Sequence, residues 1–277
     1  SCREFFVGGR MPEIKIQSLS ARVYMLCYSD FSIAHSGVTA GPLWVAERLT
    51  SEGVQAAKSV PRVDQFFAEP RLPEVDRAEL ENYRGSGYDR GHMAPSADMT
   101  TEESQAESFS LANVVPQLPA LNRRLWADIE STARGLALRY GEVYVVTGPA
   151  FAGQRIKRIG GRVLVPTATF KALYVPSQRA AGAWWAENYG DGRKFETVSI
   201  DELGRRLGVD VFPALPQGVT AAAAGLPTPK AGSDSAAGAA GNAPSATDAR
   251  SQSVANVSDW AFVAERFFTG LMERMMR

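Results

Sequence analysis

The sequence predicts one α+β domain with a central antiparallel β-sheet flanked by helices, followed by a linker and a C-terminal helix. Three observations support this prediction. β-Branched and aromatic runs separated by Gly and Pro fill residues 142–189, as strands of an antiparallel sheet do. Apolar residues recur at helical spacing over residues 120–140. Between residues 217 and about 257, large apolar residues almost disappear from the sequence.

Length and composition indicate a single core that folds on its own. The chain has 277 residues, of which 45% are hydrophobic and 22% charged, values typical of a globular protein. No apolar run reaches the roughly 18 residues that a membrane span needs. The formal net charge is +0, so attraction to a polyanion must come from a local patch. Such a patch is predicted between residues 143 and 186, which lack Asp and Glu but contain Arg155, Lys157, Arg158, Arg162, Lys171 and Arg179.

The first half of the domain reads as a hairpin followed by less regular structure. Residues 21–33 alternate apolar and polar side chains around a Ser-Asp break, which predicts two short strands. Residues 42–49 have near-helical spacing, and we predict a short helix, although periodicity alone does not distinguish it from a buried strand. Residues 60–90 are rich in Pro, Gly and charge, which predicts a long ordered loop, often a functional feature, with a helical turn near residues 77–83.

The second half carries clearer signals. We predict helices over residues 107–113 and 120–140, the latter ended by Gly141. Strands of one antiparallel sheet are predicted over residues 142–147, 162–165, 168–175 and 182–189. A capping-box pattern at residues 199–202 opens a helix that reaches Leu207 and stops at Gly208. Trp184 and Trp185 could stack on bases, but at strand spacing at least one belongs to the core.

The chain divides into a domain over residues 1–216, a linker over 217–257 and a C-terminal helix over 258–277. The linker is rich in Ala, Gly, Ser and Pro, a composition that cannot offset its ordering entropy. The final segment places Trp260, Phe267 and Leu271 on one amphipathic face. This helix would either dock on its own domain or serve a partner protein, a homodimer or a membrane surface.

Cys2 and Cys27 are the only cysteines, and they suit either one disulfide or two unrelated buried thiols. We favour the disulfide, which would fasten the N-terminal residues to the first strand. The chain begins without an initiator Met, which suggests a processed N-terminus. Because disulfides persist in oxidising compartments, we expect a secreted or periplasmic protein.

One of the two histidines follows a cluster of residues suited to phosphate chemistry. His92 ends the run Asp89-Arg90-Gly91-His92, and the ordinary pKa of histidine suits proton abstraction from water. Arg90 would share its side of an extended strand and could meet a phosphate oxygen. Gly91 would permit a close approach. A lone histidine of this kind is more often structural than catalytic, and we assign His35 such a structural or surface role.

The order of four sequence blocks changes that balance. Tyr88-Asp89-Arg90-Gly91-His92-Met93-Ala94-Pro95 is followed by a block ending in Asn113-Val114-Val115-Pro116-Gln117, by Leu121-Asn122-Arg123-Arg124-Leu125-Trp126 and by Ile129-Glu130. This series resembles the DNA/RNA non-specific endonuclease family, whose members carry a ββα-metal motif. The resemblance spans about residues 44–216. It implies a Mg²⁺-dependent hydrolase that cuts DNA and RNA with little sequence preference and leaves 5′-phosphate ends.

The resemblance also implies roles for individual residues. His92 would be the general base and Asn122 the ligand of a hydrated Mg²⁺, for which Mn²⁺ would substitute. Arg62 would stabilise charge in the transition state, and Asp89 would shape the site. Asn113 would orient the histidine or the substrate, unless it only caps a helix end.

Glu130 lies eight residues after Asn122, about 12 Å along an ideal α-helix and about 80° around it, so we expect Glu130 to support the metal waters. The alternative to an enzyme is a catalytically weak nucleic-acid-binding or DNA-uptake protein on the same fold. The intact His92 and Asn122 argue against that alternative.

Overall fold

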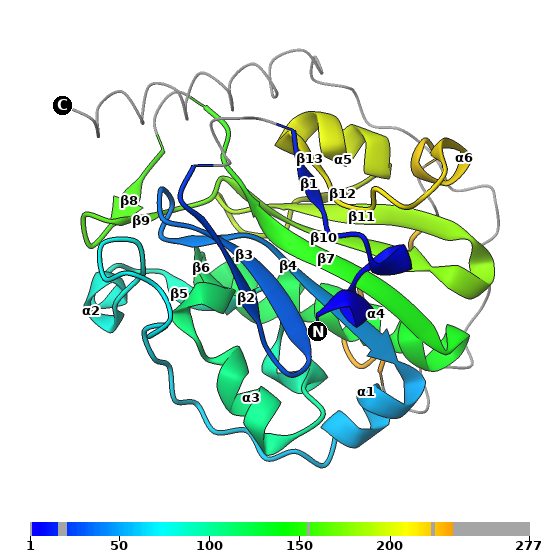
Figure 1. Ribbon diagram of the computed structural model, residues 1–277, viewed down its shortest axis with the longest axis horizontal. Helices are drawn as coiled ribbons and strands as arrows, with labels where there is room; N and C mark the ends of the chain where they lie inside the picture. The colour runs from blue at the N-terminus through cyan, green and yellow to red at the C-terminus, as the bar shows by residue number, and fades with distance from the viewer. Residues whose placement is uncertain (1, 16–20, 154–155, 223–224, 235–277) are drawn as a thin grey trace.

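A seven-stranded antiparallel sheet organises the molecule in this computed structural model, which describes residues 2–15, 21–153, 156–222 and 225–234 (Figure 1). The α+β class predicted from the sequence is confirmed. In spatial order, the strands are β12 (Phe195–Val198), β11 (Ala180–Glu187), β10 (Ala168–Val175), β7 (Glu142–Ala150), β4 (Gly41–Thr50), β3 (Phe31–Ser36) and β2 (Val23–Cys27).

Three two-stranded ribbons accompany the sheet. They pair β1 (Glu13–Ile14) with β13 (Val209–Asp210), β5 (Asp89–His92) with β6 (Val114–Gln117), and β8 (Arg158–Ile159) with β9 (Val163–Leu164). The strand expected at residues 162–165 is therefore shorter than predicted and lies outside the main sheet. The expected hairpin of residues 21–33 is present as β2 and β3, extended to Ser36.

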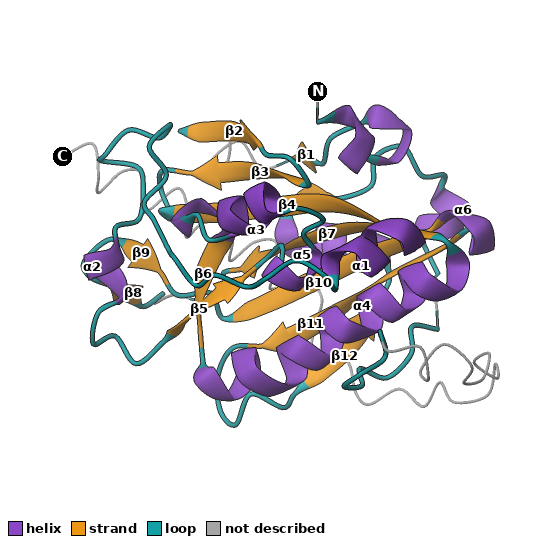
Figure 2. Ribbon diagram, turned by 90° about the horizontal axis from the view of Figure 1, so that it is seen from below, coloured by secondary structure: helices purple, strands orange, loops and turns teal. Residues whose placement is uncertain are grey.

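The helices cover both faces of the sheet. Figure 2 shows α1 (Ser51–Ala57) beside α4 (Ala127–Tyr140) across one face, while α5 (Ile200–Leu207) packs on the other. Shorter helices are α2 (Leu80–Tyr83), α3 (Glu102–Ser108), α6 (Gln217–Thr220), η1 (Arg3–Phe5), η2 (Val7–Gly9), η4 (Ser96–Asp98), η5 (Leu111–Asn113) and η7 (Pro176–Gln178). α3 begins five residues before its predicted start and ends sooner.

The two faces of the sheet build two apolar cores. Trp184 packs with α4 on one face, and the next residue, Trp185, packs with α5 on the other, because successive strand residues alternate. Both indoles are almost fully buried, so neither is available for stacking on bases. This double burial also explains why the helix predicted over residues 42–49 is wrong. β4 is a central strand apolar on both faces, and such a run lacks the alternation that marks a half-exposed strand.

α5 is the element that local sequence specified best. The hydroxyl of Ser199 accepts from the Glu202 amide at 3.1 Å, and Gly208 ends the helix with a left-handed φ of 65°. Both ends match the predicted residues. Within the part of the chain that the structure describes, no helix is long and apolar enough to cross a membrane.

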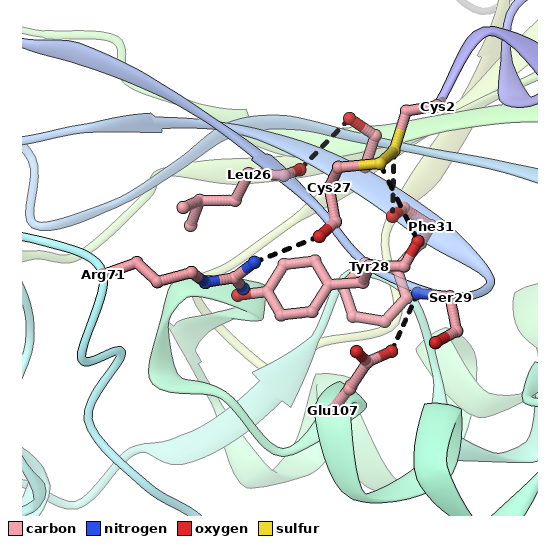
Figure 3. Close-up of a disulfide and its surroundings, with 9 residues drawn as sticks. Cys2, Leu26, Cys27, Tyr28, Ser29, Phe31, Arg71 and Glu107 are labelled. Carbon is pink, nitrogen blue, oxygen red and sulfur yellow. Dashed lines mark hydrogen bonds between the residues drawn. A yellow bond between two sulfur atoms is a disulfide. The ribbon is translucent and has the colours of Figure 1, made fainter.

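The N-terminal segment is tied to β2 by the Cys2–Cys27 disulfide (Figure 3). This is the pairing that the sequence favoured, with no free cysteine left. Arg71 donates to the Cys27 carbonyl at 3.0 Å and lies over the Tyr28 ring at 4.3 Å. The bridge therefore joins η1, β2 and the long loop at one edge of the sheet.

Part of the expected linker packs against the domain, which corrects the prediction of a flexible segment from residue 217. After α6, residues 225–234 run along α4. The Lys230 amide donates to Thr132 Oγ1 at 2.9 Å, and Asp234 pairs with Arg134 at 2.5 Å. Small residues permit this approach, because a side chain at Gly135 would collide with the Ser233 carbonyl. The predicted helix at 258–277 lies outside the described residues.

Candidate active site

The four-block sequence pattern folds into two short strands and a helix. β5 carries Asp89, Arg90 and His92, and it pairs with β6 from His92–Val114 to Asp89–Gln117. Helix η6 (Leu121–Trp126) follows and leads into α4. Gly91 has a packing reason that the sequence did not reveal, because a Cβ there would collide with the Gln117 side chain. The ββα arrangement expected from the resemblance is thus present.

η6 is a π-helical turn, and it alters the geometry expected for Asn122 and Glu130. A π-turn holds one more residue than an α-turn, so the eight-residue spacing behaves like the seven-residue spacing that repeats on one helix face. Both side chains accordingly line the same cleft. The offset of about 80° was calculated for an ideal α-helix, and the sequence did not reveal the π-turn because it leaves no clear mark in hydrophobic periodicity.

A cleft of about 820 Å³ collects most of the predicted site residues. His92, Asn122 and Glu130 line it from β5, η6 and α4. Asp89, Arg90 and Arg62 line it as well, together with residues that the sequence did not single out, namely Phe66, Tyr83, Arg84, Tyr88, Ser96, Arg123 and Arg134. Among the described residues, no group of three or more His, Cys, Asp or Glu could hold a metal ion.

His92 packs beside two aromatic rings that also contact each other. Its imidazole centroid lies 5.3 Å from that of Phe66 and 4.9 Å from that of Phe109. Nε2 is buried without a hydrogen-bond partner. Burial, assisted by the positive charges of Arg62 and Arg90, lowers the pKa of His92 to about 3. The imidazole is therefore neutral near pH 7, the form that can accept a proton.

Two arginines stack on the same aromatic pair. The Arg90 guanidinium lies 4.3 Å from the Phe66 ring centroid, and that of Arg62 lies 5.4 Å from the Phe109 centroid. Arg62 also donates to Ser96 Oγ at 2.9 Å. Both cations line the cleft together with His92. The phenylalanines were missed because nothing distinguishes a loop Phe that supports a site from one that packs in a core.

Asp89 fixes the orientation of Asn122. Asn122 Nδ2 donates to Asp89 Oδ2 at 3.0 Å, while Arg123 binds both carboxylate oxygens at 2.8 Å. Burial alone would raise the pKa of Asp89, but hydrogen bonds from Arg123 and Asn122 hold it below its ordinary value. An ionised carboxylate only accepts hydrogen bonds, so the amide must present its nitrogen to Asp89. Among the described residues, none donates to Asn122 Oδ1, which is left for another ligand.

Asn113 lies outside the cleft, unlike the other predicted residues. It is completely buried, and its amide binds backbone on both sides of the ribbon. Oδ1 accepts from the Ala94 amide at 3.0 Å, and Nδ2 donates to the carbonyls of Ala94 and Ser108 at 2.8 and 2.9 Å. It therefore cannot touch a substrate in the cleft, and it instead fixes the chain just after His92.

Glu130 is, with Asp89, one of two acidic residues that line the cleft. Burial is the largest influence and raises its pKa to about 7, against the opposing positive charges of Lys171 and Arg134. Within the described part of the chain, its carboxylate has no hydrogen-bond partner among the protein side chains. It can therefore accept hydrogen bonds from water or from a bound ligand.

The basic patch predicted over residues 143–186 is not a continuous face. Lys171 is 1% exposed, and Arg162 donates to the carbonyls of Glu74 and Arg77 at 2.5 and 3.0 Å. Lys157 lies near the cleft, with its ammonium 4.7 Å from the ring of Tyr88, a lining residue. Arg155 lies outside the described residues. Strand alternation and loop contacts separated the charges that sequence placed together.

Comparison with known proteins identifies the family. Residues 13–218 match the model of the DNA/RNA non-specific endonucleases. The chain belongs to this family. It is 34% identical over 205 residues to "Nuclease 1, mitochondrial" of Schizosaccharomyces pombe, covering 68% of this chain and 60% of that protein. It is 35% identical over 204 residues to a nuclease of a Nostoc species, covering 68% and 72% respectively.

The fold of the family agrees with the structure described above. The chain superposes on a chain of the EndoG/EndoGI complex, a crystal structure concerned with EndoG inhibition, with a TM-score of 0.63 and 27% identity. The match covers 67% of this chain and 84% of that chain. The α+β assignment thus rests on sequence and on structure independently.

Proposed function

We propose that this family member is a metal-dependent endonuclease that hydrolyses DNA and RNA with little sequence preference. The observation that carries the proposal is a neutral imidazole, His92, in one cleft with Asn122, an amide whose oxygen is left free by Asp89. Contacts to phosphate rather than to bases account for weak sequence preference. Cleavage should therefore weaken as salt screens the arginines.

His92 is proposed as the general base. Phe66 and Phe109 restrict its ring, and its lowered pKa keeps it ready to accept a proton from the attacking water. Arg62 and Arg90 lie beside the ring and are proposed to bind the phosphate oxygens, where positive charge stabilises the transition state. These cations also disfavour the protonated imidazole, so phosphate binding between them would ease the proton transfer.

Asn122 is proposed to hold Mg²⁺ through Oδ1, with Mn²⁺ as a substitute. The donor set fits, because Mg²⁺ keeps several waters and needs few protein ligands. When bound, the ion supplies charge stabilisation to the phosphate and to the leaving 3′-oxygen, and the products carry 5′-phosphate ends. Glu130 lines the same cleft as Asn122, so it is proposed to accept hydrogen bonds from ligand waters.

Plasmid and RNA degradation with Mg²⁺, with Mn²⁺ and with a chelator tests the proposal. We expect the wild type to cut both substrates only with metal, and Asn122→Ala to lose most of this activity. Arg124→Ala is the matched control, because Arg124 is exposed on the same π-turn and does not line the cleft. Products should accept a kinase label only after phosphatase treatment. Nucleic-acid binding without cleavage in either metal would instead support the uptake or binding role.

We further propose that the protein is secreted or periplasmic and works in an oxidising compartment. The Cys2–Cys27 disulfide supports this, whereas relatives from Schizosaccharomyces pombe and Bos taurus are named as mitochondrial. Mass analysis of protein purified from its native source, with and without reductant, tests the bridge. Two free thiols in the native protein would contradict the proposed compartment.

A further inference from the structure

A buried lysine contacts the backbone at the end of β5, the strand that carries His92. Lys171, on the central strand β10, is 1% exposed. Its ammonium donates to Thr147 Oγ1 at 2.8 Å and to the Met93 carbonyl at 3.3 Å, and it faces Glu47 Oε1 at 3.5 Å. Lysine is almost never buried unless paired, since removing its charge from water is costly. A residue this costly to bury calls for a specific role.

We propose that Lys171 is a positioning residue for the cleavage reaction, holding His92 in place by binding the carbonyl of the next residue, Met93. This inference rests on the proposed function of His92. Lys171 itself does not line the cleft. It acts through the backbone, so its effect should appear in the rate of the chemical step rather than in substrate binding.

The backbone around His92 shows why a side-chain donor is needed. β5 ends at His92, and among the described residues no backbone amide donates to the carbonyl of Met93 or Ala94. Three side chains supply donors instead. Trp126 Nε1 donates to the His92 carbonyl at 3.1 Å, Lys171 to that of Met93, and Asn113 Nδ2 to that of Ala94 at 2.8 Å. The three successive carbonyls thus each accept a hydrogen bond from a different side chain.

Lys171 connects these contacts to the sheet. Its ammonium lies 5.8 Å from the Trp126 ring, so one cation contacts both the Met93 carbonyl and the indole that holds the His92 carbonyl. Thr147 on β7 directs the ammonium, and Glu47 on β4 supplies the opposite charge. Three neighbouring sheet strands therefore converge on the end of β5. The rigid sheet sets the position of the proposed base.

The pairing with Glu47 favours positioning over simple stabilisation. At 3.5 Å the contact is longer than an ideal charged hydrogen bond, and Glu47 Oε2 has no partner. Burial also raises the pKa of Glu47, which weakens its charge. Replacing a buried ion pair by apolar residues is often neutral or stabilising. The directional contacts of the ammonium, to Thr147 and Met93, are what an apolar pair could not reproduce.

The decisive comparison is the double variant Lys171→Met/Glu47→Met against the wild type. Lys171→Met alone leaves Glu47 buried without its partner, so loss of activity could reflect unfolding. The double variant removes both members of the pair, so neither Lys171 nor Glu47 is left as a buried charge without its partner, and the protein should fold with near wild-type stability. We expect kcat to fall by about 10²-fold, because a shift of about 1 Å can cost that much, while KM stays within about threefold.

Two further variants guard the interpretation. Thr147→Val keeps the ion pair and the side-chain shape but removes the hydroxyl that directs the ammonium, and it should give a smaller fall in kcat. Arg48→Met/Glu142→Met is the matched control, since it removes an exposed ion pair between β4 and β7, two of the three strands that surround the Lys171 ammonium. This control should leave kcat unchanged. A double variant of Lys171 and Glu47 that folds and keeps wild-type kcat would overturn the proposal.

A second readout separates this inference from the proposed function. The chain has only two histidines, so both imidazoles can be followed by NMR, with His35 as an internal reference. We expect the His92 ring signals to shift or broaden in the Lys171→Met/Glu47→Met variant while those of His35 do not change. Unchanged His92 signals in the variant would refute the positioning role of Lys171, whether or not the wild type cleaves nucleic acid. An inactive wild type would refute only the nuclease proposal.

Discussion

The two histidines of this chain have similar electrostatics and different surroundings. Each has a ring nitrogen buried without a partner, and burial lowers each pKa to about 3. His35 is 0% exposed on β3, where Nε2 contacts the Asp76 carbonyl at 2.9 Å. His92 instead lines a cleft beside two arginines. A perturbed pKa therefore does not mark a functional residue by itself, and access to a charged cleft separates the two.

The largest expected difference between them is in activity. We expect His92→Ala to lower the cleavage rate by about 10²–10⁴-fold, the usual contribution of general base catalysis, without unfolding the protein. His35→Gln should cut plasmid at the wild-type rate. Initial rates at matched Mg²⁺ and salt check both variants. If His92→Ala cuts as fast as His35→Gln, access to the cleft does not distinguish the histidines.

The next effect concerns the residue that orients Asn122. Asp89→Asn removes the carboxylate charge that accepts a hydrogen bond from Asn122 Nδ2 and pairs with Arg123. The Asn122 amide can then turn and misplace its oxygen. Loss of such an orienting group typically costs about 10–100-fold in metal affinity or activity. Cleavage measured across a Mg²⁺ titration should show a higher Mg²⁺ requirement, with part of the rate recovered at high metal. An unchanged titration would remove Asp89 from the proposed site.

His35 should matter for stability instead. Because a carbonyl only accepts, Nε2 of His35 carries the proton that binds the Asp76 carbonyl. His35→Ala leaves that buried carbonyl unpaired, at a cost of about 1–3 kcal/mol. His35→Gln can restore the donor and should recover part of the loss. Denaturant unfolding of both variants provides the measurement, and equal stability of Ala, Gln and wild type would contradict it.

The smallest effect is a pH dependence of stability. Each histidine has a folded pKa of about 3, below its ordinary 6.5, so the unfolded chain binds more protons between these values. Their contribution to stability is complete above pH 6.5 and is lost as pH falls toward 3. His35 should dominate, because solvent in the cleft screens His92. Unfolding free energies at pH 7 and pH 4.5 should differ less in His35→Gln than in the wild type.

Local signals in the sequence accounted for much of the fold. Ser199 and Gly208 specify the ends of α5 by contacts within a few residues, and the two cysteines left a single pairing. The strand β4 was missed, because burial on both faces depends on what the rest of the chain packs against it. The packing of residues 225–234 against α4 was missed for a related reason. Its backbone is satisfied by α4 side chains such as Thr132 rather than by its own composition.

The site residues that belong to the four ordered sequence blocks could be predicted. The residues that support them from distant parts of the sequence could not. His92, Asn122 and Arg90 line the cleft as expected. The sequence places Lys171 in a predicted basic patch. Nothing in it indicates that the Lys171 ammonium binds the backbone at the end of β5. The π-turn that aligns Asn122 with Glu130 is equally invisible, because it changes a spacing by one residue without changing the apolar pattern.

The central claim, that His92 acts as the base, is tested most directly by chemical rescue. His92→Ala vacates the volume of an imidazole ring beside Phe66 and Phe109. With Mg²⁺ present, we expect added imidazole to raise the plasmid cleavage rate of this variant in proportion to the neutral imidazole concentration, with no such effect on Asn122→Ala. A His92→Ala variant that cleaves at the wild-type rate without imidazole would contradict the account.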